Sequence, residues 1–186
     1  MNTYCRRTWL ALLAATSILI ARPALAASED SLIKELDSPN ADTVAKALLA
    51  LEKQYPTSTK ALPIMKKLLS DNRQKVNRKA ARVLGSLHAD VSSDDIKAIA
   101  TLLKASDPQA IMDGLKSLKG LKAQEAVPEI IPFLQNPTRN VVRDACRALS
   151  TLGDKKIIPL LEPLLKHADA AVQKDAADAI HALNTK

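Results

Sequence analysis

Apolar residues recur at helical spacing along the chain from about residue 30 onward, and no segment keeps the apolar–polar alternation of a strand. In "EAVPEIIPFLQ", residues 125–135, the apolar positions that fall on one helix face are Val127, Ile130, Ile131 and Leu134. After a short polar break, a second such face is formed by Val142, Cys146, Leu149 and Leu152. The pattern predicts an all-α protein whose short helices come in pairs.

The helical pattern occurs five times. A small residue is followed four positions later by leucine or isoleucine at Ala47/Leu51, Ala80/Leu84, Gly114/Leu118, Ala145/Leu149 and Ala176/Ile180, with successive spacings of 33, 34, 31 and 31 residues. The same offsets align the leucines that close the preceding helices: Leu36, Leu69, Leu103, Leu134 and Leu165. A pair of helices this short cannot bury its own apolar face, so we expect the pairs to stack and share one continuous core.

Polar breaks separate the two helices of a pair, as in "DSPN" (37–40), "ASDP" (105–108) and "QNPT" (135–138). Asn, Asp and Ser supply capping oxygens, and proline is tolerated in the first turn of a helix, where its missing N–H costs nothing. Three prolines share one aligned position near the start of a first helix: Pro63, Pro128 and Pro159. These positions are predicted to lie in first helical turns.

With these features the chain resembles the HEAT-repeat family, and in particular its short bacterial HEAT-like members. The best-matching segments are "EAVPEIIPFLQNPTRNVVRDACRALSTLGD" and "IIPLLEPLLKHADAAVQKDAADAIHAL", and the resemblance covers about residues 30–184. It implies a right-handed α-solenoid of about five hairpins in one repeat domain, residues 27–186. The expected units are 30–56, 60–89, 93–122, 124–154 and 155–184.

The first 26 residues have the pattern of a cleaved export signal. Arg6 and Arg7 precede an apolar run from Trp9 to Ile20, and Ala24-Leu25-Ala26 has the small-x-small pattern cut by signal peptidase, here between Ala26 and Ala27. The alternatives are an uncleaved membrane anchor, for which the run is short, and a buried helix of the fold, against which the cleavage pattern argues. The prediction is a bacterial periplasmic or secreted protein with no stable membrane anchor after cleavage.

Two export routes fit this leader. "CRRTWLA" resembles the twin-arginine signal, but Cys5 replaces the usual Ser or Thr and Ala11 replaces Lys. Adjacent arginines are also common in ordinary leaders. The general Sec route is therefore favoured over the twin-arginine route.

Composition changes once the leader is removed. The net charge falls from +7 to +4, because Arg6, Arg7 and Arg22 leave and no acidic residue does. Only Tyr55 and Phe133 remain as aromatic residues, too few to offer the rings on which sugars or unpaired bases stack. The low charge also argues against nucleic-acid binding.

Cys146 lies between Arg143 and Arg147, a setting that can lower the pKa of a thiol and make it reactive. Its aligned equivalents are all apolar: Leu48, Ala81, Leu115 and Ala177. The column is therefore predicted to point into the shared core, which makes Cys146 a packing residue with a raised pKa.

Basic residues recur in two columns of the second helices. The first column reads Ala45, Arg78, Met112, Arg143 and Lys174; the second, one turn later, reads Leu49, Arg82, Lys116, Arg147 and Asp178. The family resemblance implies that arginine in the first column contacts a neighbouring repeat, and that second helices line the concave side. We define the basic strip as Arg78, Arg82, Lys116, Arg143 and Arg147. It is a candidate site for an acidic protein patch or an anionic headgroup; the alternative is a solvated, partly paired helix face.

No pattern indicates catalysis, a cofactor or a metal site. The three histidines, His88, His167 and His181, lack the i, i+4 spacing of helical metal ligands. Each is followed by alanine, whereas HEAT-like iron hydroxylases carry His-Glu pairs. HEAT-like bilin lyases act on cytosolic proteins and HEAT-like glycosylases on DNA, which the leader and the charge argue against. Asp144, Asp175 and Asp178 are expected to face solvent.

The sequence therefore predicts an exported, monomeric, non-catalytic HEAT-like scaffold that binds a protein partner in the periplasm. The rival predictions are an accessory or assembly factor for, or a subunit of, an extracytoplasmic enzyme complex, and a HEAT-like enzyme that takes an anionic ligand. A purely structural protein is the third class.

Overall fold

The computed structural model describes residues 27–186. The predicted leader, residues 1–26, lies outside the described residues. All regular secondary structure within residues 27–186 is helical, and there is no strand. This confirms the predicted all-α fold class. None of these helices is both long enough and apolar enough for a membrane crossing.

The helices come in five successive pairs within the described part of the chain. The second helix of each pair is a continuous α-helix: α2 (Ala41–Gln54), α4 (Gln74–Ser86), α6 (Pro108–Gly120), α8 (Arg139–Leu152) and α10 (Ala170–Asn184). The first helices are shorter: α1 (Glu29–Glu35), α3 (Leu62–Lys67), α5 (Ser93–Ala100), α7 (Val127–Ile130) and α9 (Ile158–Leu161).

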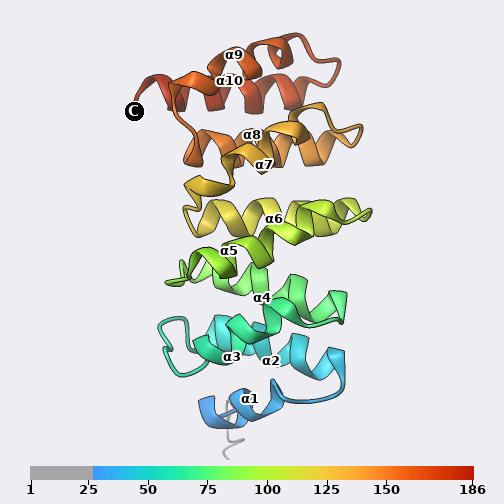
Figure 1. The fold of residues 1–186 in the computed structure, drawn as a ribbon, viewed down its shortest axis with the longest axis vertical. Helices are drawn as coiled ribbons and strands as arrows, with labels where there is room; N and C mark the ends of the chain where they lie inside the picture. Colours follow the sequence, from blue (N-terminus) through green and yellow to red (C-terminus); the bar gives the residue numbers. More distant parts are fainter. Residues whose placement is uncertain (1–26) are drawn as a thin grey trace, which may run out of the picture.

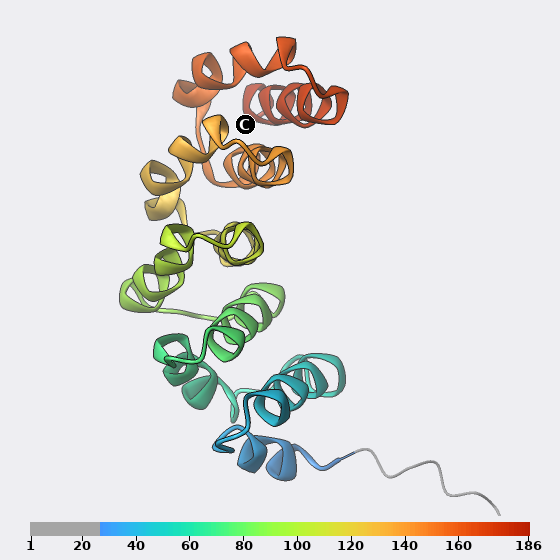
Figure 2. The same ribbon diagram turned by 90° about the vertical axis from the view of Figure 1, so that its right-hand side faces the viewer.

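The pairs stack in chain order into a solenoid (Figure 1). Each second helix packs against the next, from α2 through α4, α6 and α8 to α10. Seen from the side, the stack is curved, with the second helices along its inner side and the first helices along its outer side (Figure 2). The second helices therefore form the concave face.

The core follows the repeat columns. Four of the small residues, Ala47, Ala80, Ala145 and Ala176, are at most 1% exposed, and Gly114 is also buried. Glycine is required where α4 and α6 approach most closely, because a Cβ on Gly85 would lie 2.6 Å from Ser117 Cα and one on Gly120 would lie 2.2 Å from the Gly85 carbonyl oxygen. Small residues thus set the separation of neighbouring repeats.

The first helices of the last two pairs differ from the prediction. The periodicity across residues 125–135 predicts one continuous helix, but α7 ends at Ile130 and a 3₁₀ segment continues over Ile131–Gln135. Pro132 lies at the start of that segment, and Pro163 has the same place after α9. A proline cannot donate the i→i−4 bond of an α-helix, which favours a tighter helix there. Proline is not required for this change, because 3₁₀ segments also follow α3 over Leu68–Ser70 and α5 over Thr101–Lys104.

Helix starts agree with the predicted chemistry of the breaks. Asn40 caps α2 by accepting hydrogen bonds from the Asp42 and Thr43 amides, and Asp107 caps α6 by accepting one from the Gln109 amide. Pro63, Pro128 and Pro159 lie in the first turns of α3, α7 and α9, as expected.

The last pair departs from the predicted burial pattern. Leu165, in the column of closing leucines, is 42% exposed, and Ala177, the equivalent of Cys146, is also exposed. In the other pairs these columns are covered by a neighbouring repeat. Residues 155–184 have a neighbour within the described structure on one side only, which accounts for the difference.

Candidate functional site

The five residues of the basic strip lie on three neighbouring second helices. Arg78 and Arg82 are on α4, Lys116 is on α6, and Arg143 and Arg147 are on α8. The strip therefore runs across the middle of the concave face. Its capacity to bind an anion depends on how far each positive charge is already paired.

Arg78 contacts the next repeat, as the family resemblance implies. Its Nε and Nη2 donate to Asp113 Oδ2 over 3.0 and 2.8 Å, and its Nη1 donates to Asp107 Oδ2 over 2.8 Å. Gln109 Nε2 donates to the other oxygen of Asp113 over 3.1 Å. Both oxygens of this carboxylate are thus occupied.

The next two interfaces repeat the arrangement with different bases. Lys116 Nζ lies 3.2 Å from Asp144 Oδ2 of the following repeat. Arg143 Nε donates to Asp175 Oδ2 over 2.6 Å, and Arg147 Nη2 lies 3.1 Å from Asp175 Oδ1. The hydrogen bond from Arg143 to Asp175 raises the pKa of the guanidinium above its usual value.

The three acceptors in this series, Asp113, Asp144 and Asp175, are only 7–8% exposed, and we call them the buried aspartates. The expectation that Asp144 and Asp175 face solvent is therefore wrong, because the preceding repeat supplies a cation to each. Asp178 is exposed as expected and pairs with Lys174 within α10. The buried aspartates share one aligned column, directly after the first basic column, and this register was the sequence signal for the ion pairs.

The interface between the first two repeats lacks such a pair. Ala45 and Leu49 stand where later repeats carry the base, and Lys79 stands where later repeats carry the aspartate. Lys79 has no ion-pair or hydrogen-bond partner among residues 27–186. Arg82 likewise has none in the described structure, since Asp113 is already bound by Arg78.

A hollow of about 470 Å³ opens between α4 and α6 beside these two cations. Its walls are formed by Gln74, Lys75, Arg78, Lys79, Arg82, Gln109 and Asp113. Of these, Lys75 pairs with the exposed Asp42 of the first repeat. Four residues of the basic strip are therefore paired to carboxylates. Among residues 27–186, Arg82 is the strip residue that keeps an unpaired charge, and Lys79, which is outside the strip, lies beside it and is also unpaired.

Cys146 is fully buried in the shared core. Burial raises the pKa of its thiol to about 12, and the nearby Asp175 carboxylate adds to the effect. The two flanking arginines point their charge toward Asp175, so the thiol is a packing residue, as predicted.

The histidines have structural contacts. His88 Nδ1 lies 2.6 Å from the carbonyl oxygen of Gly120 in the next repeat, and His167 Nδ1 accepts a hydrogen bond from the Asp169 amide. In the described part of the chain, no group of three or more His, Cys, Asp or Glu side chains is placed to hold a metal ion.

A family model described as HEAT repeats matches residues 96–183. Over these residues the chain is similar to HEAT repeats. The match confirms the resemblance inferred from the sequence, over the third, fourth and fifth helix pairs. No curated protein matches the chain.

Solved structures with the same fold include the complex of CpcE and CpcF of phycocyanin lyase from Nostoc sp. PCC7120, with a TM-score of 0.74, 22% identity and coverage of 89% of this chain and 68% of that one. A designed armadillo repeat protein in complex with the peptide (KR)4 has a TM-score of 0.64 and 20% identity, with 83% of this chain and 81% of that one covered. At these identities the likeness establishes the fold.

The pairing of the buried aspartates predicts their effect on stability. Asp175→Asn keeps the shape of the side chain but leaves Arg143 without its carboxylate and Arg147 with only the longer contact to Asp144, at 3.6 Å. We expect a loss of about 1–2 kcal/mol in the free energy of unfolding, less than for a fully buried pair because both arginines are partly solvated.

The matched control is Asp178→Asn on the same helix, which removes an exposed i, i+4 pair and is expected to cost less than about 0.5 kcal/mol. Urea unfolding followed by circular dichroism measures both. Equal losses in the two variants would contradict the assignment.

Proposed function

We propose that the protein is an exported, non-catalytic scaffold that binds a protein partner along its concave face in the bacterial periplasm. The observation that carries the proposal is the series of ion pairs from one repeat to the next. Four of the five bases of the strip and the three buried aspartates join neighbouring second helices. What remains is a surface held in a fixed shape.

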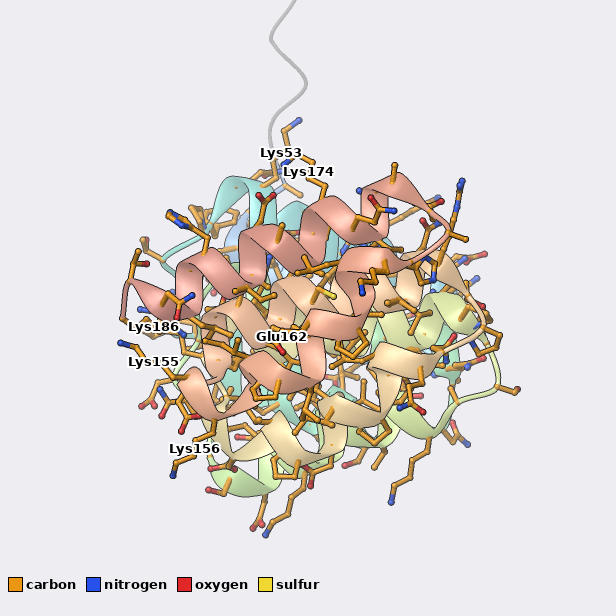
Figure 3. All side chains as sticks on the ribbon, turned by 90° about the horizontal axis from the view of Figure 1, so that it is seen from above. Lys53, Lys155, Lys156, Glu162, Lys174 and Lys186 are labelled. Atoms are coloured by element: carbon orange, nitrogen blue, oxygen red, sulfur yellow. The ribbon has the colours of Figure 1, made fainter. Side chains whose placement is uncertain are left out.

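Such a surface suits recognition of a partner. Interlocked repeats present a long face that needs little ordering on binding, so less binding energy is lost to conformational entropy. Seen down the stack, Lys53 of α2 and Lys174 of α10 project from the side formed by the second helices (Figure 3). The face therefore offers exposed charged side chains from the first pair to the last.

The similar solved structures support binding by this type of fold. The designed armadillo protein is complexed with a peptide, and CpcE is complexed with a second protein, CpcF. The second of these also favours the alternative function, an accessory factor or subunit of an enzyme complex, because CpcE and CpcF are those of phycocyanin lyase. Both functions require a protein-binding face, and they differ in whether the bound partner is an enzyme.

Site-specific photo-crosslinking tests which face binds. A photoreactive amino acid at Lys53 or Lys174 on the second-helix side is expected to capture one and the same partner in living cells. Control positions are Lys67 on α3 and Glu129 on α7, both exposed on first helices. We expect no capture from them. Capture of the partner with equal yield from the control positions would refute binding by the concave face.

The proposed export to the periplasm has a separate test. The full chain is expected in the periplasmic fraction with Ala27 as its first residue, read by mass spectrometry. Arg6→Lys with Arg7→Lys is expected to leave export unchanged, because the Sec route needs only positive charge there. Retention of this variant in the cytoplasm would assign the twin-arginine route instead, and an uncleaved chain in the cytoplasm would exclude export.

A further inference from the structure

Lys79 and Arg82 are neighbours one turn apart on α4, and neither is neutralised in the described structure. Arg82 is exposed, whereas Lys79 is partly buried. Burial, followed by the repulsion of Arg82, lowers the pKa of Lys79 below its usual value. Two cations are therefore held together where the protein gains nothing from their proximity.

The repeat alignment shows why no carboxylate among residues 27–186 forms an ion pair with either of them, although Asp113 and Glu52 lie close enough to Lys79 to act on its charge. At the three later interfaces, the base of one repeat meets an aspartate of the next. At the first interface, the apolar Ala45 and Leu49 take the place of the base, so an aspartate at position 79 would receive no cation from the preceding repeat. Lysine at position 79 needs no cation from the preceding repeat, and it adds a positive charge beside Arg82.

These two cations line the hollow between α4 and α6. Gln74 and Gln109 lie on its walls and carry amide groups able to donate further hydrogen bonds. Arg82 provides the planar fork that binds both oxygens of a carboxylate, and Lys79 provides a compact charge. Asp113 also lines the hollow, and its negative charge opposes a doubly charged group more than a singly charged one.

We propose that this hollow binds a carboxylate side chain from an acidic, extended segment of the partner protein. The inference rests on the proposed scaffold function and adds the chemistry of the partner. The concave face continues on both sides of the hollow along α2 and α8, so the segment lies across neighbouring second helices with one Asp or Glu seated between Lys79 and Arg82.

The test uses a fluorescent octaglutamate peptide as the probe and the chain from Ala27 as the protein, at low salt, with binding followed by fluorescence anisotropy. Lys79→Gln with Arg82→Gln is expected to weaken binding at least tenfold. The control, Lys155→Gln with Lys156→Gln, removes the same charge from exposed lysines at one edge of the stack (Figure 3) and is expected to leave affinity within twofold.

Each other result overturns the inference. An equal loss in both double variants would mean that only net charge attracts the peptide. Displacement of the peptide by inorganic phosphate at lower concentration than by free glutamate would mean that the hollow prefers a phosphoryl group. Because neither Lys79 nor Arg82 forms an ion pair, the melting temperature of the double variant is expected to be equal to or above that of the parent, so loss of binding is separable from unfolding.

Failure of this inference is distinguishable from failure of the scaffold function. If the double variant is still crosslinked to its partner with full yield from Lys53 and Lys174, the carboxylate subsite is wrong and the scaffold stands. If the peptide binds as expected but no partner is captured from the concave face of the parent chain, the scaffold function is wrong.

Discussion

A carboxylate buried between two repeats must be met by a cation from its neighbour, and this constraint organises the concave side of the solenoid. A buried carboxylate without a partner costs several kcal/mol, so it tolerates no mismatch along the stack. Asp113, Asp144 and Asp175 each sit at an interface whose preceding repeat supplies a base. Where the preceding repeat is apolar at both basic columns, the acidic position is a lysine. Base and acid therefore vary together from one interface to the next.

The same constraint decides which charges are available to a partner. A strip of five bases looks, from sequence, like an extended anion-binding surface. Pairing removes most of that charge, because each arginine that holds a neighbouring repeat is already neutralised. Within the described residues, the positive charge left unpaired beside this series is that of Lys79 and Arg82. Both lie at the interface between α4 and α6, where the series of ion pairs begins. Recognition and stability are thus divided between different residues: Arg82 of the second basic column and Lys79 of the aspartate column stay unpaired, while the other bases of the strip hold neighbouring repeats.

The repeat period, the paired helices and the core positions could be predicted because each depends on apolar spacing, which one sequence displays directly. Cys146 was assigned to the core on the same basis, from the apolar residues aligned with it. The 3₁₀ segments that close the first helices, such as those after Ile130 and Leu161, were missed because apolar periodicity does not distinguish the last turn of an α-helix from a 3₁₀ turn. The burial of Asp144 and Asp175 was missed because the polarity of a residue does not show whether a neighbouring repeat supplies its counter-charge. An alignment of bases in one repeat with acids in the next contained that information.

The measurement that tests this account most directly is a pair of double-mutant cycles sharing Asp113. One cycle combines Asp113→Asn with Arg78→Gln, and the other combines it with Arg82→Gln; each coupling energy comes from urea unfolding. The account predicts a coupling of about 1–2 kcal/mol between Arg78 and Asp113, and less than about 0.3 kcal/mol between Arg82 and Asp113. An Arg82 coupling as large as that of Arg78 would show that the two arginines share the carboxylate, and would contradict the division between paired and unpaired charge.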